Sequence, residues 1–404
     1  MASYLLGVVL FATGIAITIA LHEWGHFMAA RAFGMRVRRF FIGFGPTITS
    51  YRRGNTEYGF KAFPLGGFCD IAGMTNQDQV TPEEAPHAMM HKPWWQRIIV
   101  LLGGILMNIL VGFVTLYFVA CVVGLPNLKV DTTPVVGEVA CVPSKQLDAT
   151  TLSPCEGQGP AARAGIQTGD VIVAIDHKNV DSFAAVRSYV FDKPNQDLTF
   201  TIDRDGVRRD VVIRVQEVHR LSTNGDDLVA GAIGVSSAPL KNTVIQYNPV
   251  TAASGAAVFS AHMVGATVEG LAQFPAKLPG VAAAIVGGER DHNSPMSVVG
   301  ASRVGGELIQ HSYWSSFFMM LASLNFFLAL FNLIPLPPLD GGHIAVVIYE
   351  KLRDAFRKRR GLQPAGPADY TKLMPLTFAV AGLLLAVGAL VIVADVVNPI
   401  RLLG

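Results

Sequence analysis

Long apolar runs alternate with polar stretches along the chain of 404 residues. Four of these runs are long enough to cross a bilayer as helices, which takes about 20 predominantly apolar residues. They lie within residues 1–33, 94–125, 313–342 and 374–397. The pattern therefore predicts a multi-pass α-helical membrane protein with four transmembrane helices.

Lysine and arginine gather in two of the intervening segments, residues 34–93 and residues 343–373. Short loops rich in these residues face the cytoplasm, so we expect both segments on the cytoplasmic side of the membrane. The second of them is predicted to be a basic loop. The N-terminus and the long polar stretch that follows the second span are then extracytoplasmic.

A fifth apolar stretch, residues 250–286, lies in the predicted linker 219–312 and is rich in Ala, Gly and Val. The chain is predicted to be extracytoplasmic before this stretch and cytoplasmic after residues 313–342. Only one membrane crossing can lie between these two points, and the span within 313–342 is that crossing. We therefore expect residues 250–286 to lie on the membrane or dip into it without crossing.

Shorter alternations of apolar and polar residues predict β-structure in residues 36–70, with a turn at Arg53–Asn55. These hairpins come directly after the first predicted span and would form a membrane-associated sheet at its edge. An exposed strand there can pair with an extended peptide. The alternative is a cytoplasmic loop with incidental hairpins, and the sequence leaves the two open.

Residues 130–218 have the composition of a soluble domain, with predicted strands at 171–175, 198–202 and 211–215. The run from Pro160 to Asp170 reads P-A-A-R-A-G-I-Q-T-G-D and resembles the signature of a bacterial PDZ domain. Such domains bind extended peptides by strand addition, although a domain here can equally act by blocking access. Cys141 and Cys155 both lie in this region, where a disulfide is allowed but not established by the spacing.

Composition supports the membrane assignment and excludes other classes. The chain is 51% hydrophobic and only 15% charged, whereas soluble domains carry about a quarter charged residues. With a net charge of +2 and no basic stripe with interleaved aromatic residues, the sequence predicts no nucleic-acid partner. The four cysteines show no C-x-x-C spacing, so a cysteine zinc site is not supported.

The chemical signal is the sequence His22-Glu23-Trp24-Gly25-His26 at the end of the first apolar run. Histidines four residues apart lie on one helix face, where both imidazoles can bind one Zn²⁺. Glu23 is then free to take a proton from a zinc-bound water. The alternative is a pair of helix-end histidines that reach for the membrane interface.

A second motif ends the third apolar run, where three prolines precede Asp340-Gly341-Gly342. The predicted topology places Asp340 at the same depth as the two histidines, and its carboxylate suits the remaining zinc position. A helix-capping aspartate is the alternative.

Residues 293–297 would approach this site from outside, as a substrate clamp or as a plain connector. Asn108, in the second apolar run, needs either a substrate contact or an interhelical hydrogen bond.

Together, H-E-W-G-H, G-G-x-x-x-N (103–108), the PDZ-like insert and N-L-I-P-L-P-P-L-D-G-G (332–342) resemble the site-2 protease family. These are intramembrane zinc metalloproteases, and this chain is similar to their bacterial single-PDZ branch. The resemblance implies zinc bound by His22, His26 and Asp340, with Glu23 as general base. It also implies substrate contacts from polar side chains in the spans, namely Asn108, Asn325 and Asn332.

The family resemblance further implies the location and the partners. It implies a bacterial inner-membrane enzyme that cuts single-pass membrane proteins such as anti-sigma factors, after an upstream site-1-type protease has trimmed them. The alternative function is a non-catalytic membrane PDZ scaffold or a metal transporter. A scaffold has no need of Glu23, and a transporter needs polar groups across the full membrane depth, whereas here they concentrate toward one side.

Overall fold

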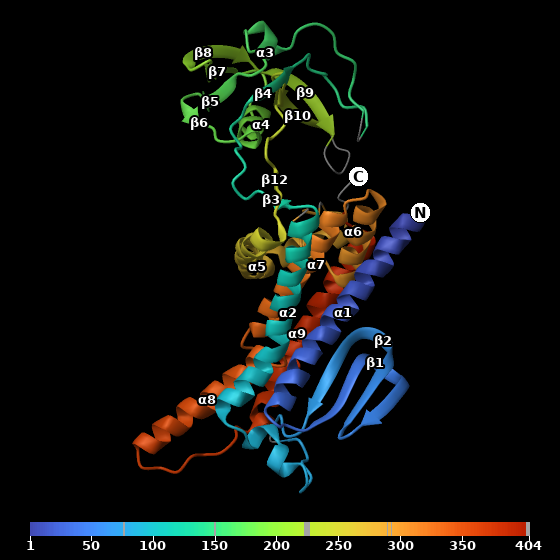
Figure 1. Cartoon of the computed structure of the whole chain (residues 1–404). Coiled ribbons are helices and arrows are strands. Elements are labelled where there is room, and N and C mark those ends of the chain that lie inside the picture. The colour runs from blue at the N-terminus through green and yellow to red at the C-terminus, as the bar shows by residue number, and fades with distance from the viewer. Residues whose placement is uncertain (76, 149–150, 222–226, 289, 292, 401–404) are drawn as a thin grey trace. The chain divides into compact units, whose positions relative to one another are not determined.

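The computed structural model describes residues 1–75, 77–148, 151–221, 227–288, 290–291 and 293–400. The chain forms two compact units, coloured along the chain in Figure 1. Unit 1 comprises residues 1–125 and 246–404, and unit 2 comprises residues 126–245. Two short strands, β3 (Leu125–Pro126) and β12 (Val244–Ile245), mark where the chain passes from one unit to the other.

Four helices of unit 1 are long and apolar enough to cross a membrane, among the residues that the structure describes. This confirms the predicted number of spans. They are α1 (Ala2–Ala32), α2 (Trp94–Val122), α7 (Trp314–Leu333) and α9 (Met374–Val397), the last preceded by the 3₁₀ turn η3 (Tyr370–Leu373). Their outward faces carry large apolar side chains such as Leu106 and Phe378, as expected of helices surrounded by lipid.

The 37-residue helix α5 (Pro249–Ile285) contains Pro275 and Pro279 and is not among the four spans. Ala252 and Ala256 pack it against α2 and α7, and Val281 and Ala284 pack it against α9. The predicted absence of a fifth crossing is thus consistent with the structure. How α5 lies relative to the membrane remains a prediction.

The predicted approach of residues 293–297 to the metal site is wrong, and the connector alternative holds. The Ser297 amide donates to Asp395 of α9 (2.6 Å), and Lys277 of α5 donates to the Asn293 carbonyl (2.8 Å). The segment leads into α6 (Val298–Gln310), which packs against Phe11 in the first half of α1. Asp395 also forms a buried ion pair with Arg290 (2.5 Å), which no sequence pattern had singled out.

The predicted β-structure is present as β1 (Val37–Arg53) and β2 (Thr56–Ile71), with the turn where it was expected. Residues 39–42 of β1 pair both with 67–70 and with 57–60 of β2. The two strands therefore bend into a sheet of four short segments. Within the described residues, the segment 66–71 is paired along one side only.

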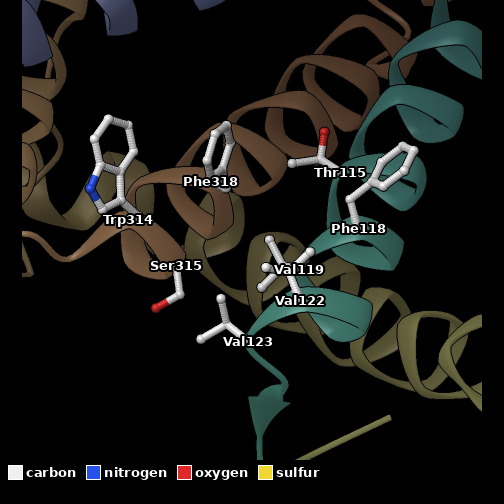
Figure 2. Close-up of a pocket in the computed structure, with 8 residues that line it drawn as sticks. All are labelled: Thr115, Phe118, Val119, Val122, Val123, Trp314, Ser315 and Phe318. Atoms are coloured by element: carbon white, nitrogen blue, oxygen red, sulfur yellow. The ribbon is translucent and has the colours of Figure 1, made fainter. Parts of the chain in front are cut away.

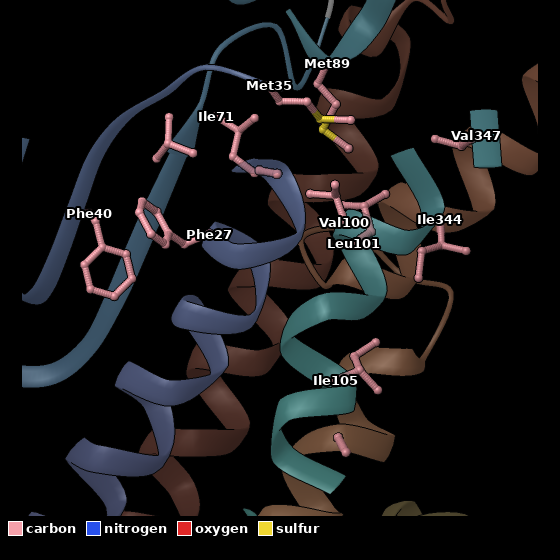
Figure 3. Close-up of a cluster of buried hydrophobic side chains, with 13 residues drawn as sticks. Phe27, Met35, Phe40, Ile71, Met89, Val100, Leu101, Ile105, Ile344 and Val347 are labelled. Carbon is pink, nitrogen blue, oxygen red and sulfur yellow. The ribbon is translucent and has the colours of Figure 1, made fainter. Parts of the chain in front are cut away.

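A hydrophobic cluster joins this sheet to the helices near the end of α1 (Figure 3). Phe27 of α1 packs against Phe40 of the sheet, with ring centroids 5.5 Å apart. Met89, in a connection that contains the turns η1 (Ala85–His87) and η2 (Met89–His91), packs here with Val100 of α2. The cluster fixes the C-terminal half of α1, which carries both histidines, between the sheet and α2.

The structure differs from the prediction in the third span and the basic loop, because most of the predicted loop is a helix. Helix α7 ends at Leu333, residues 334–339 are not helical, and a new helix, α8 (Asp340–Arg359), occupies most of the predicted loop. Good helix formers and apolar residues at helical spacing explain α8, because Ile344 and Val347 pack toward α2. A high content of Lys and Arg does not by itself predict a loop.

Unit 2 is built on an antiparallel sheet in the order β6-β5-β7-β8, with α4 (Phe183–Phe191) packed on it. The predicted strands are confirmed as β5 (Val171–Ile175), β7 (Asp197–Arg204) and β8 (Val207–Arg214). The other elements are β4 (Val136–Val139), α3 (Pro160–Arg163), β6 (Lys178–Asn179), β9 (Gln216–Leu221), β10 (Asp227–Ala232) and β11 (Val235–Ser237).

Unit 2 extends further along the chain than the predicted domain, which ended at residue 218. Ile233, beyond β10, is buried in the main core of the unit, and Ala230 packs with Val142 in a second cluster. The structure also answers the question that the cysteine spacing left open. Cys141 and Cys155 form a disulfide, with Cα atoms 5.8 Å apart.

Candidate metal centre

Three candidate ligands that are far apart in sequence meet at one point in unit 1. The Nε2 atoms of His22 and His26, on adjacent turns of α1, are 3.2 Å apart. Asp340 Oδ2, at the start of α8, lies 3.2 Å from His22 Nε2 and 3.4 Å from His26 Nε2. Both imidazoles are buried, so the three atoms converge in a space shielded from solvent.

The hydrogen bonds around these side chains suit a metal ion. His26 Nδ1 lies 2.8 Å from the Val100 carbonyl oxygen, so this nitrogen carries the proton and donates it. The lone pair of His26 is thereby placed on Nε2, which faces His22 and Asp340. Within the described residues, Asp340 Oδ2 has no hydrogen-bond partner of good geometry.

Gly104 of α2 makes the space for both rings. A Cβ atom at this position would lie 2.5 Å from His26 Nε2 and 2.6 Å from His22 Nε2. Only a residue without a side chain allows α2 to approach the two histidines this closely. Two imidazole nitrogens and one carboxylate with a remaining open position form a donor set that zinc enzymes use.

The break between α7 and α8 positions Asp340. Residues 334–339 include three prolines, which cannot continue a helix, and the segment folds back on the first turn of α8. A Cβ at Gly341 would collide with the carbonyl oxygens of Leu333 and Ile334. This tight fold directs the Asp340 carboxylate at α1, where it lies 3.2 Å from His22 Nε2 and 3.4 Å from His26 Nε2.

Glu23 faces a cavity of about 260 Å³ next to the three ligands. The cavity is lined by polar and apolar residues from α1, α2, α7, the proline segment and the start of α8, namely Ile19, His22, Glu23, Asn108, Leu328, Asn332, Pro338 and Asp340. A Cβ at Gly67 would lie 3.2 Å from Glu23 Cγ, so the one-sided segment 66–71 borders the site.

The three asparagines differ in their surroundings. Asn108 is 1% exposed and lines the cavity, and neither atom of its amide group has a hydrogen-bond partner within the described residues. Asn332 lines the same cavity. Asn325 does not line it, because its amide donates to Thr18 of α1 (3.1 Å) and to the Leu321 carbonyl (2.9 Å). The structure thus gives Asn325 a bridging position between α7 and α1.

Two residues near the site were not among the predicted site residues. Gly104 stood in the G-G-x-x-x-N pattern, but only the fold shows what its missing side chain permits. His343, one turn after Asp340, stacks on Tyr370 with ring centroids 5.8 Å apart. Its spacing of three residues from a predicted ligand was the signal that could have identified it.

A second cavity, of about 450 Å³, lies between α2 and α7 and is shown in Figure 2. Its lining is almost entirely apolar, with Trp314 and Phe318 facing Phe118 and Val119. It contains no His, Asp, Glu or Cys side chain. This cavity therefore offers no groups for acid–base or metal chemistry, unlike the polar cavity beside Glu23.

Comparisons with known proteins agree with this geometry. The model of peptidase family M50 matches residues 10–368. The chain is 45% identical to the zinc metalloprotease Rip1 of Mycolicibacterium smegmatis over 98% of both chains, and 43% identical to Rip1 of Mycobacterium tuberculosis over 99% of both.

For part of the chain there is also a structural match. The PDZ domain of the SdrC-like protein from Listeria monocytogenes matches 29% of this chain and 94% of that domain, at 17% identity and a TM-score of 0.17. The family itself rests on the full-length matches and on the converging histidines and aspartate. The chain belongs to peptidase family M50 and is a multi-pass membrane zinc metalloprotease.

Proposed function

We propose that the chain hydrolyses peptide bonds inside the membrane, with zinc held by His22, His26 and Asp340 and with Glu23 as general base. The observation that carries the proposal is the convergence of the three ligand atoms beside the Glu23 carboxylate. When bound, zinc polarises the scissile carbonyl and lowers the pKa of a water toward 7.

The residues of the chain supply the other steps. Glu23 takes a proton from the attacking water and transfers it to the leaving nitrogen as the C–N bond breaks. The bond from His26 to the Val100 carbonyl keeps that imidazole in the tautomer that leaves Nε2 unprotonated. The tight turn at Gly341 holds the Asp340 carboxylate toward α1 during the reaction.

A helical substrate must unwind before water can reach its backbone carbonyls, and the freed groups need new partners in the membrane. The buried amide of Asn108 has no hydrogen-bond partner among the residues that the structure describes, and it faces the cavity with Asn332. The one-sided segment 66–71 offers backbone groups to an extended peptide beside Glu23. We assign these groups to substrate binding, and Asn325 to positioning α7 against α1.

The substrates that fit this site are single-pass membrane proteins of the anti-sigma-factor type, already trimmed by an outer site-1-type protease. A cavity of about 260 Å³ between helices suits a short extended stretch of a substrate better than an intact helix, which is about 10 Å wide. We place the N-terminus and unit 2 outside a bacterial inner membrane, because the basic segments 34–93 and 343–373 belong inside. Unit 2 would exclude substrates that retain a folded outer domain.

The proposal is tested with Glu23→Gln, which keeps the size of the side chain but removes the base. A co-expressed single-pass substrate with a short outer segment should be cut by the wild type and left intact by the variant. Zinc content per purified chain should be unchanged, because Glu23 is not a ligand. Cleavage that persists in Glu23→Gln would show that another group acts as the base.

The ligand assignment has its own test in Asp340→Asn. This change removes the negative charge from the ligand set, so zinc content after dialysis should fall well below that of the wild type. An unchanged zinc content would place the third ligand elsewhere. The two variants therefore separate the role of the base from the role of the metal ligand.

A further inference from the structure

Helix α8 has two opposite faces with different surroundings. Ile344, Val347 and Glu350 are buried toward the rest of unit 1. On the other side, Ile348, Leu352 and Phe356 follow one another at a spacing of four residues and are 43%, 66% and 56% exposed. Residues spaced by four lie on one helix face. The three side chains, with the 58% exposed Tyr349, form an outward apolar stripe.

Arginines border this stripe. At 100° per residue, Arg353 and Arg360 lie along one edge of it and Arg359 lies within it, whereas Lys351 and Lys358 lie closer to the buried face, beside Val347. Arg360 is stacked over the Phe356 ring, with the guanidinium carbon 4.3 Å from the centroid. Lys358, Arg359 and Arg360 are exposed and have no ion-pair partner in the part of the chain that the structure describes.

The two acidic residues of this part of the helix do not neutralise the face. Glu350 is buried against Arg97 of α2 (2.7 Å), and Asp354 pairs with Arg353 (3.0 Å) and accepts from the Ala365 amide (3.1 Å). Both carboxylates are therefore engaged within the chain. The exposed charge along the apolar stripe is positive.

The position of α8 places this face at the membrane boundary. The bond between Glu350 and Arg97 fastens the middle of α8 to the first turn of α2. That turn carries Trp94 and Trp95, which are 43% and 44% exposed, and exposed tryptophans at a span end mark the interface with the headgroups. Lys351 lies over the Trp94 ring, 5.7 Å from its centroid.

We propose that the outward face of α8 binds the anionic phosphate headgroups of membrane lipids. An apolar stripe with flanking cations is the pattern of helices that lie in the interface, with the apolar side chains among the acyl chains and the cations at the phosphates. This face lies opposite the buried face of α8. Lipid binding here does not depend on the proposed reaction.

The test uses the full chain, purified in detergent and titrated with phosphatidylglycerol or phosphatidylcholine, with retained lipids counted by native mass spectrometry. The wild type should retain phosphatidylglycerol in preference to phosphatidylcholine. The triple variant Lys358→Gln, Arg359→Gln and Arg360→Gln should lose at least about fivefold in this preference, since each cation near an anionic surface contributes a factor of roughly five.

A matched control removes three exposed cations of unit 2, with Arg208→Gln, Arg209→Gln and Arg214→Gln, and should keep the preference. Equal retention of the two lipids by the wild type, or an equal loss in the control, would overturn the proposal.

A second measurement does not depend on charge. With Cys69 and Cys121 replaced by Ser, a nitroxide at Phe356→Cys in proteoliposomes should be reached by oxygen dissolved in lipid. Preferential access of a water-soluble nickel chelate would contradict the assignment.

Discussion

At the scale of single residues, the metal site depends on the lack of a side chain at Gly104 as well as on the three candidate ligands. His22 and His26 face Asp340 only because α2 passes close to them at Gly104. The Val100 carbonyl, one turn earlier on α2, fixes the orientation of the His26 ring. The second helix is thus part of the site although it supplies none of the three ligands.

Gly104→Ala tests this dependence. The added Cβ would lie 2.5–2.6 Å from imidazole atoms of both histidines, closer than such contacts occur, so at least one ring must turn. We expect zinc affinity to fall at least about tenfold, the effect of disturbing the orientation of a ligand. The control is Gly388→Ala in α9, where no atom of the described residues lies within 4 Å of the new atom. Equal zinc affinity in both variants would argue against the close approach of α2.

At the scale of elements, two polar clusters fasten the segments that surround the site. Arg97 and Glu350 join α2 to α8, the helix that begins with Asp340, and both side chains are buried. Glu350 also accepts from the Ala368 amide (2.7 Å), which ties down the connection after α8. In the connection before α2, Arg38 of β1 binds Glu84 (2.8 Å) and Asp78 (2.8 Å).

Glu350→Gln should destabilise unit 1 strongly. The glutamine can still accept from the Ala368 amide, but Arg97 becomes a buried charge without a counterion, which costs about 3–5 kcal/mol. Thermal unfolding in detergent measures the loss. Arg39→Gln is the comparison, because it breaks the partly exposed pair with Asp70 and should cost no more than about 1 kcal/mol. Similar melting temperatures for the two variants would contradict this account of the buried pair.

The Arg38 cluster predicts a pH dependence. Hydrogen bonds from Arg38 outweigh the effect of burial and lower the pKa of Glu84 from 4.5 to about 2. A lowered pKa stabilises the folded state above the unfolded value, and this contribution is lost as the pH falls from about 4.5 toward 2. In Glu84→Gln, the melting temperature should therefore fall less over this range than in the wild type. Glu83→Gln, at an exposed neighbour, should keep the wild-type slope.

At the scale of the whole molecule, one compact unit is inserted into the chain of another. The candidate ligands His26 and Asp340 are separated by more than 300 residues, and unit 2 accounts for residues 126–245 of that separation. Every residue that lines the cavity beside Glu23 belongs to unit 1. The candidate metal site is therefore built from unit 1 alone, and the proposed access control would belong to unit 2.

Replacing residues 126–245 by a short flexible linker tests this division. The zinc content per chain should stay at the wild-type level, because the ligands and the helices that position them are all in unit 1. If unit 2 excludes untrimmed substrates, the shortened chain should also cut a substrate that retains a folded outer domain. Loss of zinc from a shortened chain that still folds would show that the site depends on unit 2.

The local sequence determined the features that depend on neighbours along the chain. Apolar runs of membrane length predict spans whatever their partners, and the spacing of His22 and His26 places both on one helix face. The hairpin turn at residues 53–55 and the strands β5, β7 and β8 follow from equally local patterns. The prediction of Asp340 as third ligand needed a further argument, because the topology of the spans placed Asp340 at the same membrane depth as the two histidines. In the structure, the Asp340 carboxylate lies beside both histidines.

Only the tertiary structure decided the rest, because packing between distant segments has no local signature. It separated Asn108, which lines the cavity with no hydrogen-bond partner in the described part of the chain, from Asn325, which donates to Thr18. It joined Cys141 to Cys155 and showed the buried pair of Arg290 and Asp395, since sequence spacing carries no information on distance in space. The helix α8 belongs here too, because the packing of one of its faces on α2 stabilises it where charge content had indicated a loop.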